Sequence, residues 1–400
     1  MHSAFRTFYV VAVLCGMSSL AGADFLAAHQ RAFVDQPGVV EAHLVELESS
    51  MLARGADRLE FAMPDGARYL AARSSLEFRS ADNLTWRGWL DDREDLRVVL
   101  TLKGGMIAGR IESSDGVYEI RPGSDGQHEL LKLDLDAFPS CGGGVDAVTT
   151  ASPAPRGAAP SGSVMDVMAM YTPQARDAAG GVAQIEATIQ AAVDNSNTAF
   201  IDSDMDARFV LVHTALAAYN DTGDSSADLV WLSGDAAVAS LRDTQRADLV
   251  SLITEDGGGF CGIGFVMRNP GPGFEGSAFQ VTARQCAVGN LSYAHEHGHN
   301  MGFEHDPANG TSPASASFPW SFGHFDDGSY RTVMSYSNQC TSGCTRVAHF
   351  SNPDITHNGT ATGIANQRDN ARSGDETALI VAAFRQGEFV FSSGFEADIR

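Results

Sequence analysis

The chain has 400 residues, of which 44% are hydrophobic, 19% charged and 8% aromatic, a composition typical of a folded protein of two domains. The 50 acidic residues outnumber the 27 Lys and Arg, which gives a net charge of −23. The composition excludes collagenous, disordered and small disulfide-scaffold proteins, and the charge disfavours nucleic acid or anionic lipid as a partner.

The first 23 residues have the pattern of a signal peptide. Arg6 supplies a positive charge, residues 8–15 form a short apolar segment, and residues 21–23 are the small residues of a cleavage site. The apolar segment is too short to cross a bilayer, and no later stretch is long enough. We therefore expect a secreted protein, extracellular or periplasmic, without a membrane anchor.

Residues 24–141 are predicted to form a small, mostly β domain. Short segments of alternating polarity, such as 96–102 and 117–120, are typical of strands. Asp-Gly pairs favour tight turns between antiparallel strands. These pairs lie at 65–66, 115–116 and 125–126.

Residues 142–163 are rich in Gly, Pro and Ala and show no apolar periodicity. This composition predicts a flexible linker that proteases can cleave. The linker separates the β domain from residues 164–386, where the pattern changes. Residues 387–400 form a C-terminal tail of unknown role.

Helical and strand patterns alternate in residues 164–386. Thr172 and Pro173 are typical of a helix start, and apolar residues on one face continue to about Phe200. Strands are predicted at 164–171, 208–213, 248–253 and 264–267, and shorter helices at 228–231 and 236–241. This alternation predicts an α/β (α+β) fold with a twisted mixed sheet.

The cysteines outside the signal peptide are Cys141, Cys261, Cys286, Cys340 and Cys344. An odd number in an oxidising compartment leaves one thiol unpaired. The last four can pair in three ways. We favour Cys261 with Cys286, and Cys340 with Cys344, because each pair encloses a segment rich in Gly, Ser or Pro. Cys141 is then the unpaired thiol.

Residues 295–306 read HEHGHNMGFEHD and contain three histidines at metal-binding spacing. His295 and His299 lie four residues apart, so a helix brings both to one face. Gly302 can adopt positive φ and end the helix, which lets His305 complete the set. Three imidazoles with an open fourth position are typical of catalytic zinc, and Glu296 is placed to hold a water on the metal.

A helix that is rich in histidine by chance is the alternative interpretation of this motif. His297 lies between the two helical ligands and points away from their face, so we interpret it as a bystander.

The motif, with Thr332-Val-Met-Ser-Tyr336 downstream, resembles the metzincin clan of zinc endopeptidases. Asn300 and Asp306 make it most similar to reprolysin-type enzymes and bacterial peptidyl-Asp metallopeptidases. The resemblance covers about residues 164–385. It implies a metzincin-like catalytic domain with an active-site helix and a single catalytic Zn²⁺; no pattern indicates a structural Ca²⁺ ion.

The resemblance also implies roles for single residues. Met334 falls at the Met-turn, where a thioether packs beneath the metal; an ordinary core methionine is the alternative. Tyr336 departs from the reprolysin pattern and matches a Tyr of other metzincins that binds zinc or stabilises the oxyanion, and simple packing is its alternative. Glu296 acts as the general base on a zinc-bound water. Residues 261–266 are expected to be the edge strand along which a peptide binds.

Cys141 precedes Gly142 directly before the linker, and many metzincin zymogens resemble this arrangement in blocking zinc with a prosegment Cys. Residues 24–141 are accordingly predicted to be an inhibitory propeptide and Cys141 its zymogen switch, against the alternative of a free or mispaired thiol. The protein is then a bacterial, monomeric zymogen.

A preference for acidic residues at the cleavage site is implied by the peptidyl-Asp resemblance and requires a cation in the pocket. Arg331 and Arg346 are the candidates. The expected partners are protein or peptide substrates. The alternative function is a secreted zinc-binding or adhesive module without hydrolysis, although the presence of Glu296 favours an enzyme.

Overall fold

The computed structural model describes residues 24–32, 35–147 and 163–385. The predicted signal peptide, most of the predicted linker (148–162) and the C-terminal tail 387–400 lie outside the described residues. Within those ranges, no helix has both the length and the apolar character that crossing a membrane requires.

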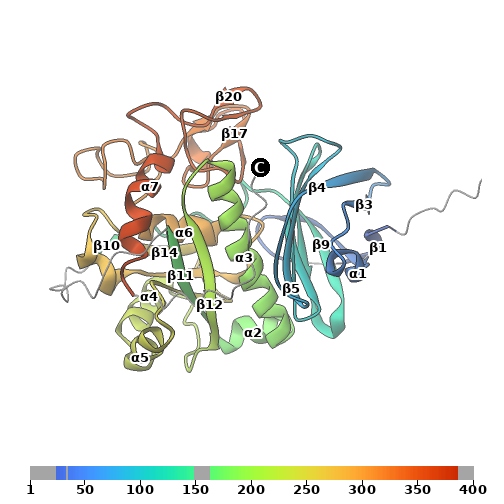
Figure 1. Cartoon of the computed structure of the whole chain (residues 1–400), viewed down its shortest axis with the longest axis horizontal. Coiled ribbons are helices and arrows are strands. Elements are labelled where there is room, and N and C mark those ends of the chain that lie inside the picture. The colour runs from blue at the N-terminus through green and yellow to red at the C-terminus, as the bar shows by residue number, and fades with distance from the viewer. Residues whose placement is uncertain (1–23, 33–34, 148–162, 386–400) are drawn as a thin grey trace, which may run out of the picture.

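The N-terminal domain is a closed barrel in the strand order β1-β2-β9-β8-β7-β6-β5-β4-β3 (Figure 1). Neighbouring strands are antiparallel, except that β1 and β3 pair in parallel to close the barrel. The three Asp-Gly pairs lie between β3 and β4, β7 and β8, and β8 and β9, as predicted. Its elements are β1 (Leu26–Ala32), β2 (Val39–Leu47), α1 (Ser49–Ala53), β3 (Arg58–Ala62), β4 (Arg68–Ser80), β5 (Asn83–Leu90), β6 (Arg97–Lys103), β7 (Met106–Ser113), β8 (Gly116–Pro122) and β9 (His128–Leu133).

Strand β6 faces the barrel core on one side and the second domain on the other. Side chains alternate along a strand, so Val98 and Leu100 point into the barrel core. The alternate residues Arg97 and Thr101 face the second domain, where they contact Asp202 and Asp194. The barrel thus has an apolar interior and a polar face towards its partner domain.

The second domain is built on a sheet in the order β10-β14-β15-β13-β11-β12. The pair of β14 and β15 is antiparallel and the other neighbouring pairs are parallel, so the sheet is mixed, as predicted. The strands are β10 (Gly144–Asp146), β11 (Val164–Tyr171), β12 (Arg208–Leu216), β13 (Leu249–Thr254), β14 (Gly262–Val266) and β15 (Phe279–Ala283). Strand β15 was not predicted.

Two sequence predictions need correction here. The helix expected from Pro173 to about Phe200 is two helices, because Gly180 and Gly181 adopt φ of +97° and +136° and turn the chain between them. The start of the expected linker is also ordered. Residues 144–146 form β10, which pairs in parallel with β14.

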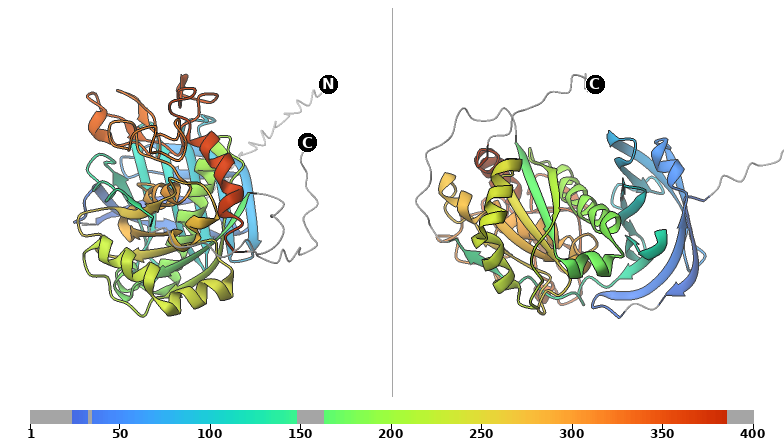
Figure 2. Two further views of the ribbon diagram at one scale, coloured as in Figure 1. Left: turned by 90° about the vertical axis from the view of Figure 1, so that its left-hand side faces the viewer. Right: turned by 90° about the horizontal axis from the view of Figure 1, so that it is seen from below.

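Helix α3 lies between the sheet and the barrel, where it packs on β12 on one side and on β6 and β7 on the other (Figures 1 and 2). Asp194 on α3 is fully buried and accepts hydrogen bonds from the Thr85 and Thr101 hydroxyls (2.5 and 2.6 Å) and from Arg79 (3.0 Å). The helices are α2 (Pro173–Ala179), α3 (Val182–Asp202), α4 (Ser225–Gly234), α5 (Ala236–Gln245), α6 (Ser292–Asn300) and α7 (Asn370–Val381).

Between α6 and α7 the domain is mostly loops and two-residue strands, which are β16 (Phe325–Asp326), β17 (Tyr330–Arg331), β18 (Thr345–Arg346), β19 (Thr356–His357) and β20 (Thr360–Ala361). Both favoured disulfides are present. Cys261–Cys286 joins the segment before β14 to the segment after β15, and Cys340–Cys344 closes a short loop before β18. Cys141 is the free cysteine of the described residues.

Candidate metal centre

Helix α6 carries the first part of the histidine motif and is held firmly against the sheet. The Asn300 side-chain amide donates to the main-chain oxygens of Phe265 (2.9 Å) and Phe279 (3.0 Å), which belong to β14 and β15. All residues of α6 are buried. The positions of its side chains are therefore set by the core of the domain.

The three predicted ligands converge in one place. His305 Nε2 lies 3.1 Å from His295 Nε2 and 3.1 Å from His299 Nε2. All three side chains are buried. Burial and the neighbouring imidazoles lower the pKa of His295 and His299 far below the usual value, so both rings are neutral at physiological pH. Neutral imidazoles are what a metal ion binds.

The opposite ring nitrogens fix the tautomer of each histidine. Nδ1 of His295 lies 2.9 Å from the Val333 carbonyl oxygen, and Nδ1 of His299 lies 2.8 Å from that of Phe303. Carbonyl oxygens can only accept, so each Nδ1 carries the proton and each Nε2 lone pair faces the centre. His305 Nδ1 faces the Asn309 carbonyl oxygen at 3.3 Å in the same manner.

Two glycines in the motif make room for this arrangement. A Cβ on Gly298 would lie 2.7 Å from the Met334 sulfur, so a side chain there would displace Met334. Gly302 adopts φ of +86°, as predicted, and the chain reverses there towards His305. Met334 is fully buried. These contacts give Gly298 a role that the sequence pattern alone did not reveal.

Cys141 supplies a fourth donor atom. Its Sγ lies 3.7 Å from His299 Nε2, and the four donor atoms of Cys141 and the three histidines all lie within 4.8 Å of one another. In a tetrahedral zinc site, nitrogen ligands are about 3.3 Å apart and sulfur lies about 3.6 Å from nitrogen, given bonds of about 2.0 and 2.3 Å. The four residues therefore fit a tetrahedral metal ion.

Glu296 lies beside this centre and is fully buried. Its Oε2 accepts a hydrogen bond from the Cys141 thiol at 3.4 Å, and its Oε1 has no hydrogen-bond partner in the described chain. Burial raises the pKa of this carboxyl to about 8. A Cβ on Gly262 would lie 2.7 Å from Glu296 Cγ, so a glycine in β14 lets the carboxylate approach the strand.

Tyr336 also reaches the centre. Its hydroxyl donates to the Cys141 carbonyl oxygen at 3.2 Å, and its ring centroid lies 4.3 Å from that of His305. Its backbone N–H donates to Asp306 Oδ2 at 3.1 Å, so the residue that follows the third histidine holds Tyr336 in position. Burial, with Cys141 and Glu296 nearby, raises the pKa of the Tyr336 hydroxyl, which stays protonated as a donor.

His297 lies outside this group, in agreement with the prediction. Its ring packs against Phe209 and Tyr293, with centroids 5.2 and 4.7 Å away, and Nδ1 faces Asn300 Oδ1 at 3.1 Å. Arg331 and Arg346, the two candidate specificity residues, are buried on neighbouring strands that flank residues 332–336 in the sequence.

Residues 140–146, which span the end of the predicted propeptide and the start of the predicted linker, cover one side of the centre. The Gly142 N–H donates to the Gly262 carbonyl oxygen (2.8 Å), and the Cys261 N–H donates to the Ser140 carbonyl oxygen (3.0 Å). Together with β10, these bonds occupy the free edge of β14, the strand that was predicted to bind peptide. This ordered segment was missed because its run of glycines is typical of a linker.

Comparison with known proteins agrees with this geometry. Residues 162–368 match the family described as Metallo-peptidase family M12B Reprolysin-like. The chain is 28% identical over 380 residues to a peptidyl-Asp metalloendopeptidase of Xanthomonas campestris pv. campestris, with 88% of each chain covered. It is 26% identical over 383 residues to a protein of the same name from Stenotrophomonas maltophilia, covering 86% of this chain and 87% of the relative. A Pseudomonas aeruginosa protein of that name is 31% identical over 245 residues, or 55% of this chain and 40% of that protein.

Proposed function

This chain belongs to the reprolysin-like M12B family of metallopeptidases and is a zinc metalloendopeptidase; on that premise we propose that it is a secreted enzyme made as a latent zymogen. His295, His299 and His305 hold the catalytic zinc, and Cys141 occupies its fourth position until the linker is cut. The observation that carries this proposal is the convergence of these four donor atoms within 4.8 Å.

The residues around the centre have complementary tasks in peptide hydrolysis. A bound zinc ion polarises the scissile carbonyl group and acidifies water. Glu296 accepts a proton from the attacking water and delivers it to the leaving amine. Tyr336 donates a hydrogen bond to the substrate's carbonyl oxygen, as it now does to that of Cys141.

Latency follows from what the N-terminal domain covers. The Cys141 thiol lies against Glu296 and His299, so it takes the place that water and substrate need. Residues 142–146 occupy the edge of β14, where a peptide substrate would add as a strand. Cleavage within the predicted linker frees both places, because Cys141 then belongs to a separate chain.

A preference for acidic residues at the cleavage site is part of the proposal. The relatives are named peptidyl-Asp metalloendopeptidases, and Arg331 and Arg346 are buried cations close to the centre. The signal-peptide pattern of residues 1–23 supports secretion from a bacterial cell. We also propose that the protein acts as a monomer on protein or peptide substrates, with its propeptide as inhibitor.

Casein hydrolysis by the linker-cleaved chain tests this function. We expect activity that is lost with a zinc chelator, returns with added Zn²⁺ and is absent in Glu296→Ala, which still binds one zinc ion. A wild-type chain that binds zinc but cleaves neither casein nor a peptide library would favour the alternative of a zinc-binding or adhesive module.

A further inference from the structure

Arg331 and Arg346 lie side by side in the interior of the protein. The parallel pairing of β17 with β18 places them opposite each other, and their exposed fractions are only 2% and 7%. Burial, together with the neighbouring Arg331, lowers the pKa of Arg346 well below its usual value. Two like charges buried together are unfavourable unless an anion joins them.

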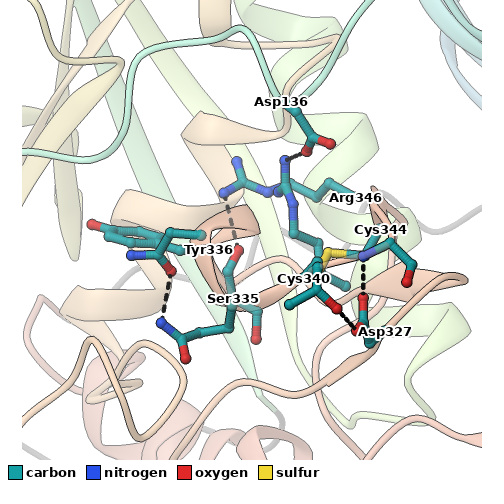
Figure 3. Close-up of a disulfide and its surroundings, with 12 residues drawn as sticks. Asp136, Asp327, Ser335, Tyr336, Cys340, Cys344 and Arg346 are labelled. Carbon is teal, nitrogen blue, oxygen red and sulfur yellow. Dashed lines mark hydrogen bonds and ion pairs between the residues drawn. A yellow bond between two sulfur atoms is a disulfide. The ribbon is translucent and has the colours of Figure 1, made fainter.

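Arg346 is fixed within its own domain. Its Nη1 donates to the Asn290 carbonyl oxygen (2.9 Å), and its Nη2 to that of Ser335 (3.4 Å). Figure 3 shows Arg346 between Asp136 and Ser335, beside the Cys340–Cys344 disulfide. The hydrogen bonds of Arg346 to Asn290 and Ser335 do not involve the N-terminal domain, so we expect Arg346 to keep its position when that domain leaves.

Arg331 is held differently. Its Nη2 donates to the Leu135 carbonyl oxygen (2.8 Å) and to the Asp136 carboxylate (3.3 Å), which both belong to the N-terminal domain. Within the described ranges, its Nε and Nη1 are buried without any hydrogen-bond partner. Every side-chain hydrogen bond of this arginine that the structure contains is therefore lost when residues 24–141 dissociate.

The two arginines line a cavity of about 310 Å³ beside the metal centre. Phe138, Pro139 and Ser140 of the N-terminal segment line one part of it, and Tyr336 connects it to the centre. An acidic side chain of a bound peptide fits such a space, because the guanidinium groups of the two arginines are donors and a carboxylate is an acceptor.

We propose that Arg331 binds the acidic side chain of the substrate directly, and that Asp136 with the Leu135 carbonyl oxygen takes its place in the latent chain. Arg346 is a positioning residue that keeps the cavity wall in place and adds positive potential. This inference rests on the proposed endopeptidase function. A guanidinium group offers two parallel N–H donors to one carboxylate, so lysine would be a poor replacement for Arg331.

Cleavage of two matched peptides tests the substrate half of the proposal. The linker-cleaved, zinc-loaded enzyme is given peptides that differ only by Asp or Asn at the preferred acidic position, and the ratio of their kcat/KM values is measured. We expect Arg331→Gln to lower this ratio about 100-fold and Arg331→Lys about tenfold. The control Arg176→Gln on α2, far along the chain from the site, should keep the wild-type ratio. An unchanged ratio in Arg331→Gln would overturn the assignment.

The proposed pairing of Arg331 with Asp136 in the latent chain can be tested without enzymatic activity. In the uncleaved, zinc-loaded chain, the rate at which a thiol reagent labels Cys141 reports opening of the N-terminal segment. Because the side chain of Asp136 is 46% exposed, we expect Asp136→Asn to raise this rate only about threefold. Arg331→Gln should have a similar effect, and the double variant should label no faster than the faster single variant. Independent, multiplying effects would show that the two residues do not act together.

The two experiments also separate this inference from the proposed function. If the wild-type chain cleaves no peptide, the proposed function fails, whereas the labelling experiment still decides whether Asp136 and Arg331 act as a pair. If the enzyme cleaves both peptides and Arg331→Gln keeps the preference for Asp, the function stands and the assignment of Arg331 is wrong. Zinc content and melting temperature show whether each variant is folded, and Arg331→Lys replaces Arg331→Gln if the latter is not.

Discussion

The two domains differ in how completely they satisfy their own polar groups. The barrel is closed, so each of its strands has a neighbour on both sides within the domain. The second domain instead has the edge of β14, a candidate metal centre and Arg331, and residues 135–146, from the end of the N-terminal domain and the segment that follows it, cover all three. The barrel is thus complete in itself, whereas the second domain has a strand edge and polar groups that the proposed cleavage would uncover.

The largest expected effect concerns the contact between the domains at Asp194. This carboxylate is fully buried and holds Thr85, Thr101 and Arg79 of the barrel. Asp194→Ala should weaken the complex of barrel and catalytic domain by about 3 kcal/mol after linker cleavage, because the two fully buried threonine hydroxyls lose their acceptor and Arg79 loses one of its two carboxylate partners. Titration calorimetry of the separated parts measures this. The exposed Asp177→Ala on α2 is the control, and equal affinity in both variants would contradict the role of Asp194.

The pH dependence of the unfolding free energy tests what a buried histidine of the barrel, His128, contributes to stability. Burial lowers the pKa of His128 to about 4, and its Nε2 accepts a hydrogen bond from the Ile107 N–H at 3.0 Å. The folded barrel therefore disfavours the protonated ring. The stability that the neutral His128 ring contributes to the fold is fully present above the unfolded pKa of about 6.5. It is lost as pH falls towards 4, a change in unfolding free energy on the order of 3 kcal/mol.

Denaturant unfolding at pH 7 and pH 4.5 measures this change. We expect His128→Gln to reduce the pH dependence of the unfolding free energy, whereas the half-exposed His29→Gln on β1 should keep it. Equal pH dependence in wild type and His128→Gln would show that another group is responsible.

Replacing Tyr336 tests the site in the second domain that linker cleavage is proposed to uncover. Replacement by Phe removes a hydroxyl that donates to a carbonyl oxygen beside the centre. We expect kcat of the linker-cleaved enzyme to fall about 100-fold, while bound zinc stays at one ion per chain. Peptide kinetics with parallel metal analysis provides the measurement. Turnover like that of the wild type would reduce Tyr336 to a packing role.

The smallest expected effect is partial activation by Cys141→Ser. The variant removes the thiol from the centre, but β10 and the Asp136–Arg331 ion pair still hold the segment in place. We therefore expect the uncleaved chain to gain only about tenfold in peptide hydrolysis, since a hydroxyl is a far weaker zinc ligand than a thiolate. An uncleaved variant as inactive as the wild type would argue against the cysteine switch.

Much of this arrangement could be predicted from local sequence signals. The spacing of His295, His299 and His305, the glycine that ends the helix, the Asp-Gly turns and both disulfides depend on neighbours in the chain or on composition. Periodicity was less informative for β15, which is buried on all sides and short. The helix break at Gly180 was missed because the apolar pattern continues across it.

The remaining features depend on contacts between distant parts of the chain. Nothing near Gly298 in the sequence reveals that Met334 packs against it, and nothing near Arg331 reveals that Asp136 is its partner. The strand β10 forms in a Gly-rich segment because the edge of β14 offers free hydrogen-bonding groups. Tertiary pairing there overrides the local preference for a flexible linker.

X-ray absorption at the zinc edge tests the central claim most directly. For the uncleaved, zinc-loaded chain we predict three nitrogen ligands and one sulfur ligand at about 2.3 Å from the metal, and for the linker-cleaved enzyme freed of its N-terminal domain a first shell without sulfur. A shell of only nitrogen and oxygen in the uncleaved chain would contradict the claim that Cys141 keeps this protease latent.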